Sequence, residues 1–246
     1  EIFKNKYPDN FFEMYIAEQN MVSCAVGLSS RGKIPFVSTF SAFFSRAHDQ
    51  IRMAAYANSN IKFCGSHAGV SIGQDGASQM GLEDISMFRS LFGCVVLYPS
   101  DAVSTQKLVE EMAKHKGLAY IRTTRMELPV IYDRAEKFEI GGSKTLRSSS
   151  KDKFAILAAG VTLHEALKAY EDLQKEGINV RIIDLYSIKP IDCATLERAG
   201  EETDGIIVVE DHYGEGGIAE AVRTCLSSSK VQVYSLSVSK KPKSGK

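Results

Sequence analysis

The sequence has no excess of charge of either sign, because 30 lysine and arginine residues balance 30 aspartate and glutamate residues. A balanced chain has no general attraction to nucleic acid or to an anionic membrane surface. We therefore expect neither nucleic acid nor a membrane as a partner. Any site for an anionic ligand has to be a local cluster of side chains.

Long apolar runs are also missing, as is the charged-then-apolar leader of a secreted protein. The cysteines are few, odd in number and without the paired spacing of a metal site: Cys24, Cys64, Cys94, Cys193 and Cys225. Most lie in apolar contexts, which favours reduced, buried and unreactive thiols. These features predict a cytoplasmic protein whose own residues hold no metal.

Short apolar segments alternate with helical patterns along nearly the whole chain, in a composition typical of a soluble globular protein. In the first half we expect strands at 34–40, 61–64, 94–98 and 118–122, and helices at 17–28, 47–58, 83–91 and 101–113. In the second half we expect strands at 154–159, 179–184, 205–209 and 231–236, and helices at 162–176, 193–201 and 218–226. Such alternation predicts parallel sheets with helices on both faces.

Residues 134–153 lose this rhythm and gain glycine, serine and lysine, which predicts a linker. The expected fold class is therefore α/β. It consists of two successive three-layer domains with mainly parallel sheets, over residues 1–133 and 154–246.

Two stretches near the N-terminus carry residues suited to chemistry. Glu18 lies where a strand-like segment meets a helix, and by itself it is a first-turn glutamate favoured by the helix dipole. Phe40 and Phe43 are spaced to meet on one side of a turn. Taken alone, such a pair belongs more often to a core than to a cofactor site.

Two further stretches follow strands. A loop with four glycines, residues 65–79, contains His67 and Asp75, and Arg125 comes just past another strand end. In an open parallel sheet, ligands bind outside the carboxyl ends of the strands. A glycine-rich loop is weak support for a site by itself, because any tight loop needs glycine.

Together, in this order and at these separations, the four stretches resemble transketolase. The segments 17–21 (Ala-Glu-Gln-Asn-Met), 38–53 and 65–73 are similar to those of the animal enzymes. So are Val-Glu-Asp-His-Tyr at 209–213 and Glu-Gly-Gly at 215–217. The resemblance implies the pyrimidine-binding domain of a thiamine-diphosphate enzyme, followed by a transketolase C-terminal domain.

The resemblance implies a role for several side chains in binding thiamine diphosphate. Glu18 matches the catalytic glutamate that meets a ring nitrogen of the aminopyrimidine, where a protonated carboxyl favours the imino tautomer. Phe43, with Phe40 beside it, matches aromatic residues that pack on the pyrimidine ring. Gln79 matches a residue near the cofactor. Arg46 stands where some relatives have an aromatic residue, so it receives no cofactor role.

The resemblance also implies a sugar-phosphate substrate, held by residues that match His67, Asp75 and Arg125. The planar guanidinium of Arg125 suits phosphate, because it donates two parallel charge-assisted hydrogen bonds. His67 is able to donate to the same phosphate in either protonation state. Asp75 would accept a hydrogen bond from a sugar hydroxyl.

Transketolases bind the diphosphate and a divalent metal, Mg²⁺ or Ca²⁺, through an N-terminal domain with a Gly-Asp-Gly motif and a downstream asparagine. Neither motif occurs here in that arrangement. The chain begins at Glu1, and relatives continue beyond Lys246, so we expect a fragment that is truncated at both ends and inactive alone. The resemblance further implies a homodimer with the active site at the subunit interface.

The function implied is reversible transfer of a two-carbon ketol unit from a ketose phosphate to an aldose phosphate, in the pentose phosphate pathway. One alternative is the beta subunit of a 2-oxo-acid dehydrogenase decarboxylase component, which shares the two-domain layout. The loop 67–79 and Arg125 favour transketolase, because a 2-oxo acid needs no sugar-phosphate clamp. A second alternative is a catalytically silent truncated isoform.

Overall fold

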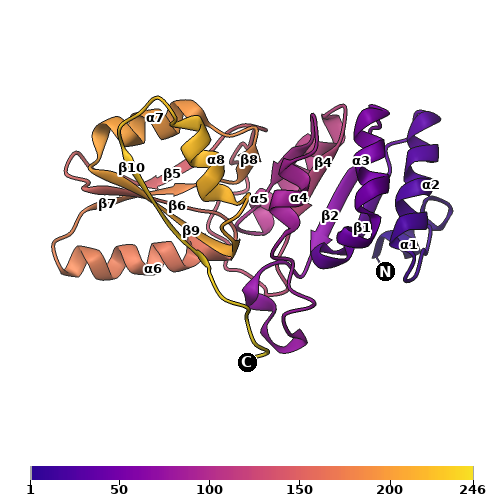
Figure 1. Ribbon diagram of the computed structural model, residues 1–246, viewed down its shortest axis with the longest axis horizontal. Coiled ribbons are helices and arrows are strands. Elements are labelled where there is room, and N and C mark those ends of the chain that lie inside the picture. The colour runs from indigo at the N-terminus through magenta and orange to yellow at the C-terminus, as the bar shows by residue number, and fades with distance from the viewer. Residues whose placement is uncertain (1, 246) are drawn as a thin grey trace.

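The computed structural model describes residues 2–245 of the chain. The first half contains α1 (Ile2–Lys6), the 3₁₀ helix η1 (Pro8–Asn10), α2 (Glu18–Ser30), β1 (Phe36–Phe40), η2 (Ser41–Ala47), α3 (His48–Tyr56), β2 (Lys62–Ser66), η3 (Val70–Asp75), α4 (Asp84–Arg89), β3 (Val95–Leu97), α5 (Ala102–Lys114) and β4 (Ala119–Arg122). The second half contains β5 (Lys144–Arg147), β6 (Phe154–Ala158), α6 (Val161–Lys175), β7 (Val180–Asp184), β8 (Ser187–Lys189), α7 (Cys193–Glu202), β9 (Gly205–Tyr213), α8 (Ile218–Cys225) and β10 (Gln232–Val238). Figure 1 shows two lobes side by side, each built around one sheet.

The sheet of the first lobe has the strand order β1-β2-β4-β3-β8. Its first four strands are parallel, and β8 pairs with β3 in the antiparallel direction. The register places Phe40 opposite Ser66, and Gly65 opposite Arg122. The carboxyl ends of β1, β2 and β4 therefore lie at one edge of the sheet, and the segments that follow them emerge together.

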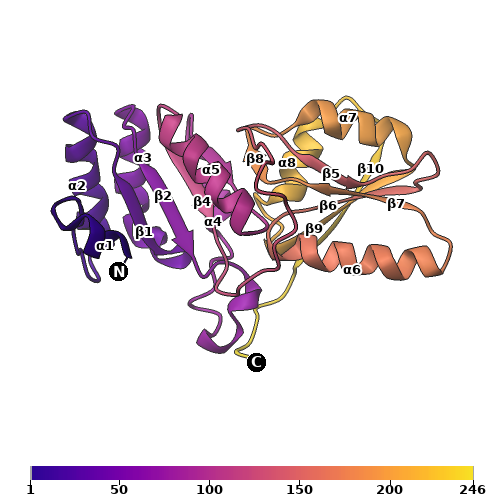
Figure 2. The same ribbon diagram turned by 180° about the vertical axis from the view of Figure 1, so that it is seen from behind.

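The sheet of the second lobe has the order β10-β9-β6-β7-β5, and all of its pairs are parallel except that of β5 with β7. In Figures 1 and 2, α6 covers one face of this sheet, and α7 and α8 cover the other. The expected fold class, two α/β domains with mainly parallel sheets, is confirmed. Within residues 2–245, no helix has both the length and the hydropathy needed to cross a membrane.

The structure differs from expectation at two short strands. β5 lies inside the stretch predicted to be a linker and pairs as an edge strand with β7. β8 follows β7 along the chain but joins the sheet of the first lobe. The division of the chain into domains 1–133 and 154–246 stays a prediction. One strand of the second range, β8, belongs to the sheet of the first lobe.

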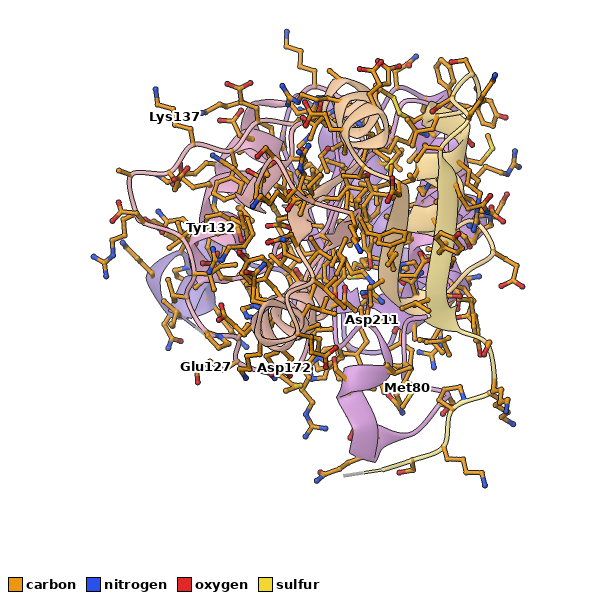
Figure 3. All side chains as sticks on the ribbon, turned by 90° about the vertical axis from the view of Figure 1, so that its left-hand side faces the viewer. Met80, Glu127, Tyr132, Lys137, Asp172 and Asp211 are labelled. Atoms are coloured by element: carbon orange, nitrogen blue, oxygen red, sulfur yellow. A yellow bond between two sulfur atoms is a disulfide. The ribbon has the colours of Figure 1, made fainter. Side chains whose placement is uncertain are left out.

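A buried ion-pair network joins the two lobes. Arg122, at the end of β4, is fully buried and donates from Nε to Asp84 at 2.9 Å and from Nη1 to Asp211 at 2.7 Å. Tyr120 and Tyr98 donate to the same two carboxylates. Although burial disfavours the cation, Asp211 and Asp84 hold the pKa of Arg122 well above its usual range. Since Asp211 belongs to β9 (Figure 3), this cation fixes one lobe against the other.

A second buried polar cluster also joins the two lobes. Asp184, at the end of β7, accepts from the Ser100 hydroxyl at 3.0 Å and from the Tyr132 hydroxyl at 2.6 Å. Ser100 also accepts from the backbone N–H of Gly160, and its carbonyl lies 2.6 Å from His164 Nε2. Burial raises the pKa of Asp184 to about 7. The start of α5 is thereby tied to the second lobe.

The cysteine expectation is wrong in part. Cys193, in the first turn of α7, forms a disulfide with Cys225 at the end of α8. Cys94 is buried as expected, whereas Cys24 is exposed. The paired residues lie 32 positions apart in the sequence, and their contact arises from the packing of α7 on α8.

Replacing Asp211 by asparagine should lower the free energy of unfolding by about 3 kcal/mol, because it leaves the buried Arg122 cation with one carboxylate instead of two. Urea unfolding followed by circular dichroism measures the loss. Asp172→Asn is the control, because Asp172 forms an exposed ion pair with Lys175 and should change stability little. A loss no larger than that of the control would contradict the role assigned to Arg122.

Asp184→Asn should flatten the dependence of stability on pH. In the folded chain Asp184 keeps its proton up to a pKa of about 7, whereas the ordinary value is 3.8. Between these values the folded state binds more protons, so the stability of the native sequence falls as pH rises from about 4 to about 7, by up to about 1.4 kcal/mol per pH unit. Unfolding free energies measured at several pH values test this. Parallel curves for the two proteins would refute it.

Candidate active site

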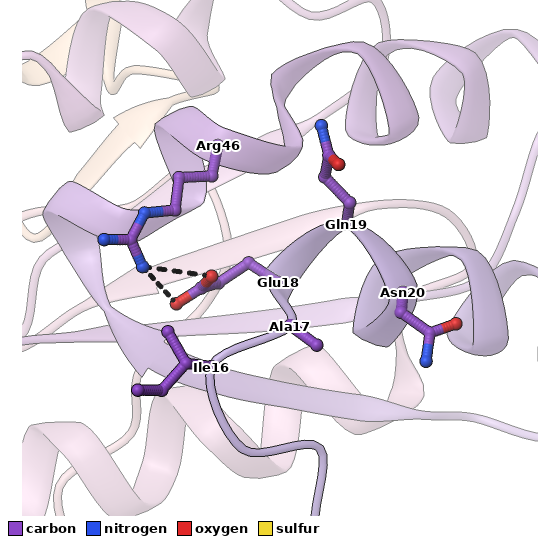
Figure 4. A pocket seen from close by; sticks show the side chains of 6 residues that line it. All are labelled: Ile16, Ala17, Glu18, Gln19, Asn20 and Arg46. Atoms are coloured by element: carbon purple, nitrogen blue, oxygen red, sulfur yellow. Dashed lines mark hydrogen bonds and ion pairs between the residues drawn. The ribbon is translucent and has the colours of Figure 1, made fainter.

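Glu18 is the first residue of α2, and its side chain is only 6% exposed. A carboxylate at a helix N-terminus is favoured by the helix dipole. Its oxygens reach an open pocket of about 540 Å³ (Figure 4). The lining residues are Ile16, Ala17, Glu18, Gln19, Asn20 and Arg46.

The partner of Glu18 is Arg46, which the sequence analysis left without a role. One guanidinium nitrogen of Arg46 donates to both carboxylate oxygens, at 3.1 and 3.2 Å (Figure 4). The guanidinium carbon also lies 4.4 Å from the centre of the Phe43 ring. Residues three apart share a side of a 3₁₀ helix, so the spacing from Phe43 to Arg46 in η2 was the available signal.

Phe40 and Phe43 belong to one stack of planar side chains. Their ring centres are 5.4 Å apart with planes 7° from parallel. The imidazole of His67 lies against Phe40, with centres 3.8 Å apart and planes 14° from parallel. The paired ends of β1 and β2 bring these residues together. The structure thus connects a predicted substrate residue to a predicted cofactor residue through aromatic contacts.

His67 follows β2 with a left-handed backbone, at φ 56°. Residues other than glycine rarely adopt this conformation, and it is most frequent where a structure constrains a functional residue. Its Nδ1 lies 3.0 Å from the Ser66 hydroxyl. Burial and the Arg125 cation lower the pKa of His67, while Asp75 acts in the opposite direction. These surroundings favour the neutral imidazole.

Asp75 and Arg125 meet at the outer side of the site. Arg125 Nη1 lies 3.0 Å from an Asp75 carboxylate oxygen, and both side chains are about one-third or more exposed. Gln79 is half-buried in the same loop, where its backbone N–H donates to Gly76. No hydrogen bond joins the Gln79 side chain to Glu18 or Phe43 within residues 2–245.

The second lobe supports the loop that carries these residues. The Tyr213 N–H, at the end of β9, donates to Leu82, and Val238 packs on Ile72 and its neighbours. The C-terminal tail reaches the same loop, where Ser244 donates to the Gln74 carbonyl at 2.8 Å. The substrate-side loop is therefore held from both lobes.

The geometry brings Glu18, Phe43, Phe40 and His67 into one connected arrangement, with Asp75 and Arg125 paired beside it. Their roles in binding stay predictions. No cluster of three or more His, Cys, Asp or Glu side chains that could hold a metal ion occurs in the part of the chain described, residues 2–245.

Comparison with known proteins identifies the family of both lobes. Residues 1–130 match the transketolase pyrimidine-binding domain, and residues 143–246 match the transketolase C-terminal domain. The whole chain is 54% identical to transketolase-like protein 2 of Mus musculus and 53% identical to transketolase of Homo sapiens. It spans 40% of the length of each of these two relatives.

A solved structure described as the inactive β4 tetramer of a split-gene transketolase is also similar. It is 35% identical with a TM-score of 0.90, over 98% of this chain and 79% of that chain. The resemblance inferred from the motifs is confirmed. Matches to both domains, in the order in which the two lobes follow one another, show that the chain belongs to the transketolase family.

Proposed function

We propose that the chain supplies the aminopyrimidine-binding and sugar-phosphate-binding part of a transketolase active site. The reaction is reversible transfer of a two-carbon ketol unit from a ketose phosphate to an aldose phosphate. The observation that carries this proposal is the buried Glu18 carboxylate, which lines an open pocket together with Arg46, whose guanidinium lies over the Phe43 ring. An aminopyrimidine requires both a carboxyl for its ring nitrogen and an aromatic surface for its face.

Bound thiamine diphosphate would supply the carbanion chemistry that the amino acids lack. Glu18 would hold a proton between one of its carboxyl oxygens and the pyrimidine ring nitrogen, which orients the ring and sets its tautomer. Phe43 would pack on the ring face and exclude water, with Phe40 behind it. Gln79 would complete the cofactor contacts from the loop.

Arg125, His67 and Asp75 would bind the substrate. The ion pair between Arg125 and Asp75 is exposed, so exchanging Asp75 for a phosphate costs little. Once released, Asp75 is free to accept a hydrogen bond from a sugar hydroxyl. If the Ser66 hydroxyl donates to His67 Nδ1, the imidazole proton sits on Nε2 and is available to a phosphate oxygen.

We propose that the diphosphate and a divalent metal, Mg²⁺ or Ca²⁺, are held by residues outside this chain, which spans 40% of the length of its relatives. We propose a homodimeric, cytoplasmic enzyme of the pentose phosphate pathway, with the active site completed at the subunit interface. A catalytically silent protein is the second candidate, because the similar split-gene chain is described as inactive. The Arg125–Asp75 clamp argues against a 2-oxo-acid dehydrogenase subunit.

The chain alone should show no ketol transfer from xylulose 5-phosphate to ribose 5-phosphate with thiamine diphosphate and magnesium. Adding a transketolase diphosphate-binding domain as a separate chain should restore turnover, because it supplies the other half of the cofactor site. A coupled assay of the product sugar phosphates measures both. Turnover by the chain alone would contradict the half-site proposal, and failure of every complementation would favour the silent protein.

In the reconstituted enzyme, Arg125→Lys should raise the KM for sugar phosphate about tenfold with little change in kcat, because lysine keeps the charge but loses the two-point hydrogen bonding. Initial rates over a range of acceptor concentrations separate the two constants. Arg134→Lys, at an exposed position, is the matched control. An unchanged KM for Arg125→Lys would remove this residue from the substrate site.

A further inference from the structure

Arg46 makes the two contacts that the proposed function assigns to the aminopyrimidine. It donates to both oxygens of Glu18 and lies over the ring of Phe43. We propose that Arg46 occupies the aminopyrimidine position when the cofactor is absent and has to leave before the cofactor binds. This inference rests on the proposed function and adds a gating residue to it.

The chemistry of the two groups is alike. A guanidinium is planar, carries N–H donors at its edge and stacks on aromatic faces. An aminopyrimidine is also planar, carries an amino donor and stacks in the same way. A side chain of this kind is therefore able to substitute for the ligand at both contacts at once.

The Phe43 ring is half-buried, and two planar groups lie against it in this structure. Phe40 stacks parallel to it, and the Arg46 guanidinium lies over it at 4.4 Å. Phe43 accordingly does not line the pocket that Glu18 and Arg46 line. A pyrimidine reaches the Phe43 ring only if Arg46 moves.

Burial explains why a competitor is retained. The Glu18 carboxylate is 6% exposed, and within residues 2–245 it has no hydrogen-bond donor other than Arg46. A buried carboxylate without a partner is costly, so the ligand-free chain needs a cation at this position. Arg46 supplies this cation when no ligand is bound.

The contact is suited to exchange rather than to permanent closure. The Arg46 side chain is 48% exposed, so it has a solvated path out of the pocket. The cation–π contact of an exposed arginine is weak, so it adds little to the barrier against leaving. While Arg46 contacts Glu18, the cofactor cannot bind there. The apparent association constant for the cofactor would therefore be the intrinsic constant multiplied by the fraction of molecules in which Arg46 has moved away.

Thiamine is the probe for this inference, because it carries the aminopyrimidine without the diphosphate. Arg46→Leu should lower its dissociation constant about tenfold, as expected when a competing ion pair and cation–π contact are removed. Isothermal titration calorimetry of the full chain measures the constant. In the native sequence, NMR of ¹⁵N-labelled arginine should show the Arg46 Nε signal moving toward that of solvated arginine as thiamine is added.

Arg52→Leu is the matched control. Arg52 is 47% exposed, pairs with Asp49 at 2.9 Å and lies over the Tyr56 ring, yet it is not part of the pocket. Its replacement should leave thiamine binding unchanged, and its Nε signal should not respond to thiamine.

Each outcome decides one of the two proposals. If Arg46→Leu binds thiamine no tighter than the native sequence, or if neither protein binds it saturably, the gating role of Arg46 is overturned. Glu18→Gln in the Arg46→Leu background separates this result from a failure of the proposed function. Unchanged thiamine binding in that double variant would overturn the assignment of Glu18 to the cofactor site. Lost binding would support that assignment.

Discussion

The Arg122 guanidinium is held between carboxylates from both lobes, and the placement of the site depends on this buried contact. Asp84 reaches it from α4 and Asp211 from β9. Removing three charges from water is costly, and close pairing offsets that cost only while all three groups stay aligned. The network therefore resists rotation of one lobe against the other. We expect this network to matter more for keeping the angle between the two sheets fixed than for the stability of the fold.

The same network determines where the substrate-side residues lie. Arg122 ends β4, and Arg125 follows three residues later at the surface, so the buried arginine positions the exposed one. Gly69, in the loop after His67, passes against the Asp211 carboxylate with φ 82°. A side chain at Gly69 would overlap that carboxylate, and the left-handed backbone also favours glycine. Packing on the ion-pair network thus explains the glycine at position 69 without a phosphate.

Most strands and helices could be predicted from the sequence, because the spacing of apolar residues depends on which side of each element is buried. β5 and β8 did not follow, because each is an edge strand that is defined by its antiparallel partner in the folded chain. The Cys193–Cys225 pair was missed for the same reason, since only the packing of α7 and α8 joins residues so distant in sequence. At the site, motifs identified the residues individually. Their connection through the stack from His67 to Phe43 required the structure.

Arg46 shows how a site residue escapes motif comparison and still follows from physical chemistry. If the site binds an aminopyrimidine as proposed, it keeps the Glu18 carboxylate buried, and that carboxylate is unfavourable whenever the ring is absent. A neighbouring arginine relieves this cost because it is planar like the ring and donates N–H groups to the carboxylate. The stack extends from Arg46 through Phe43 and Phe40 to His67, so it joins the predicted cofactor residues to a predicted substrate residue through continuous packing.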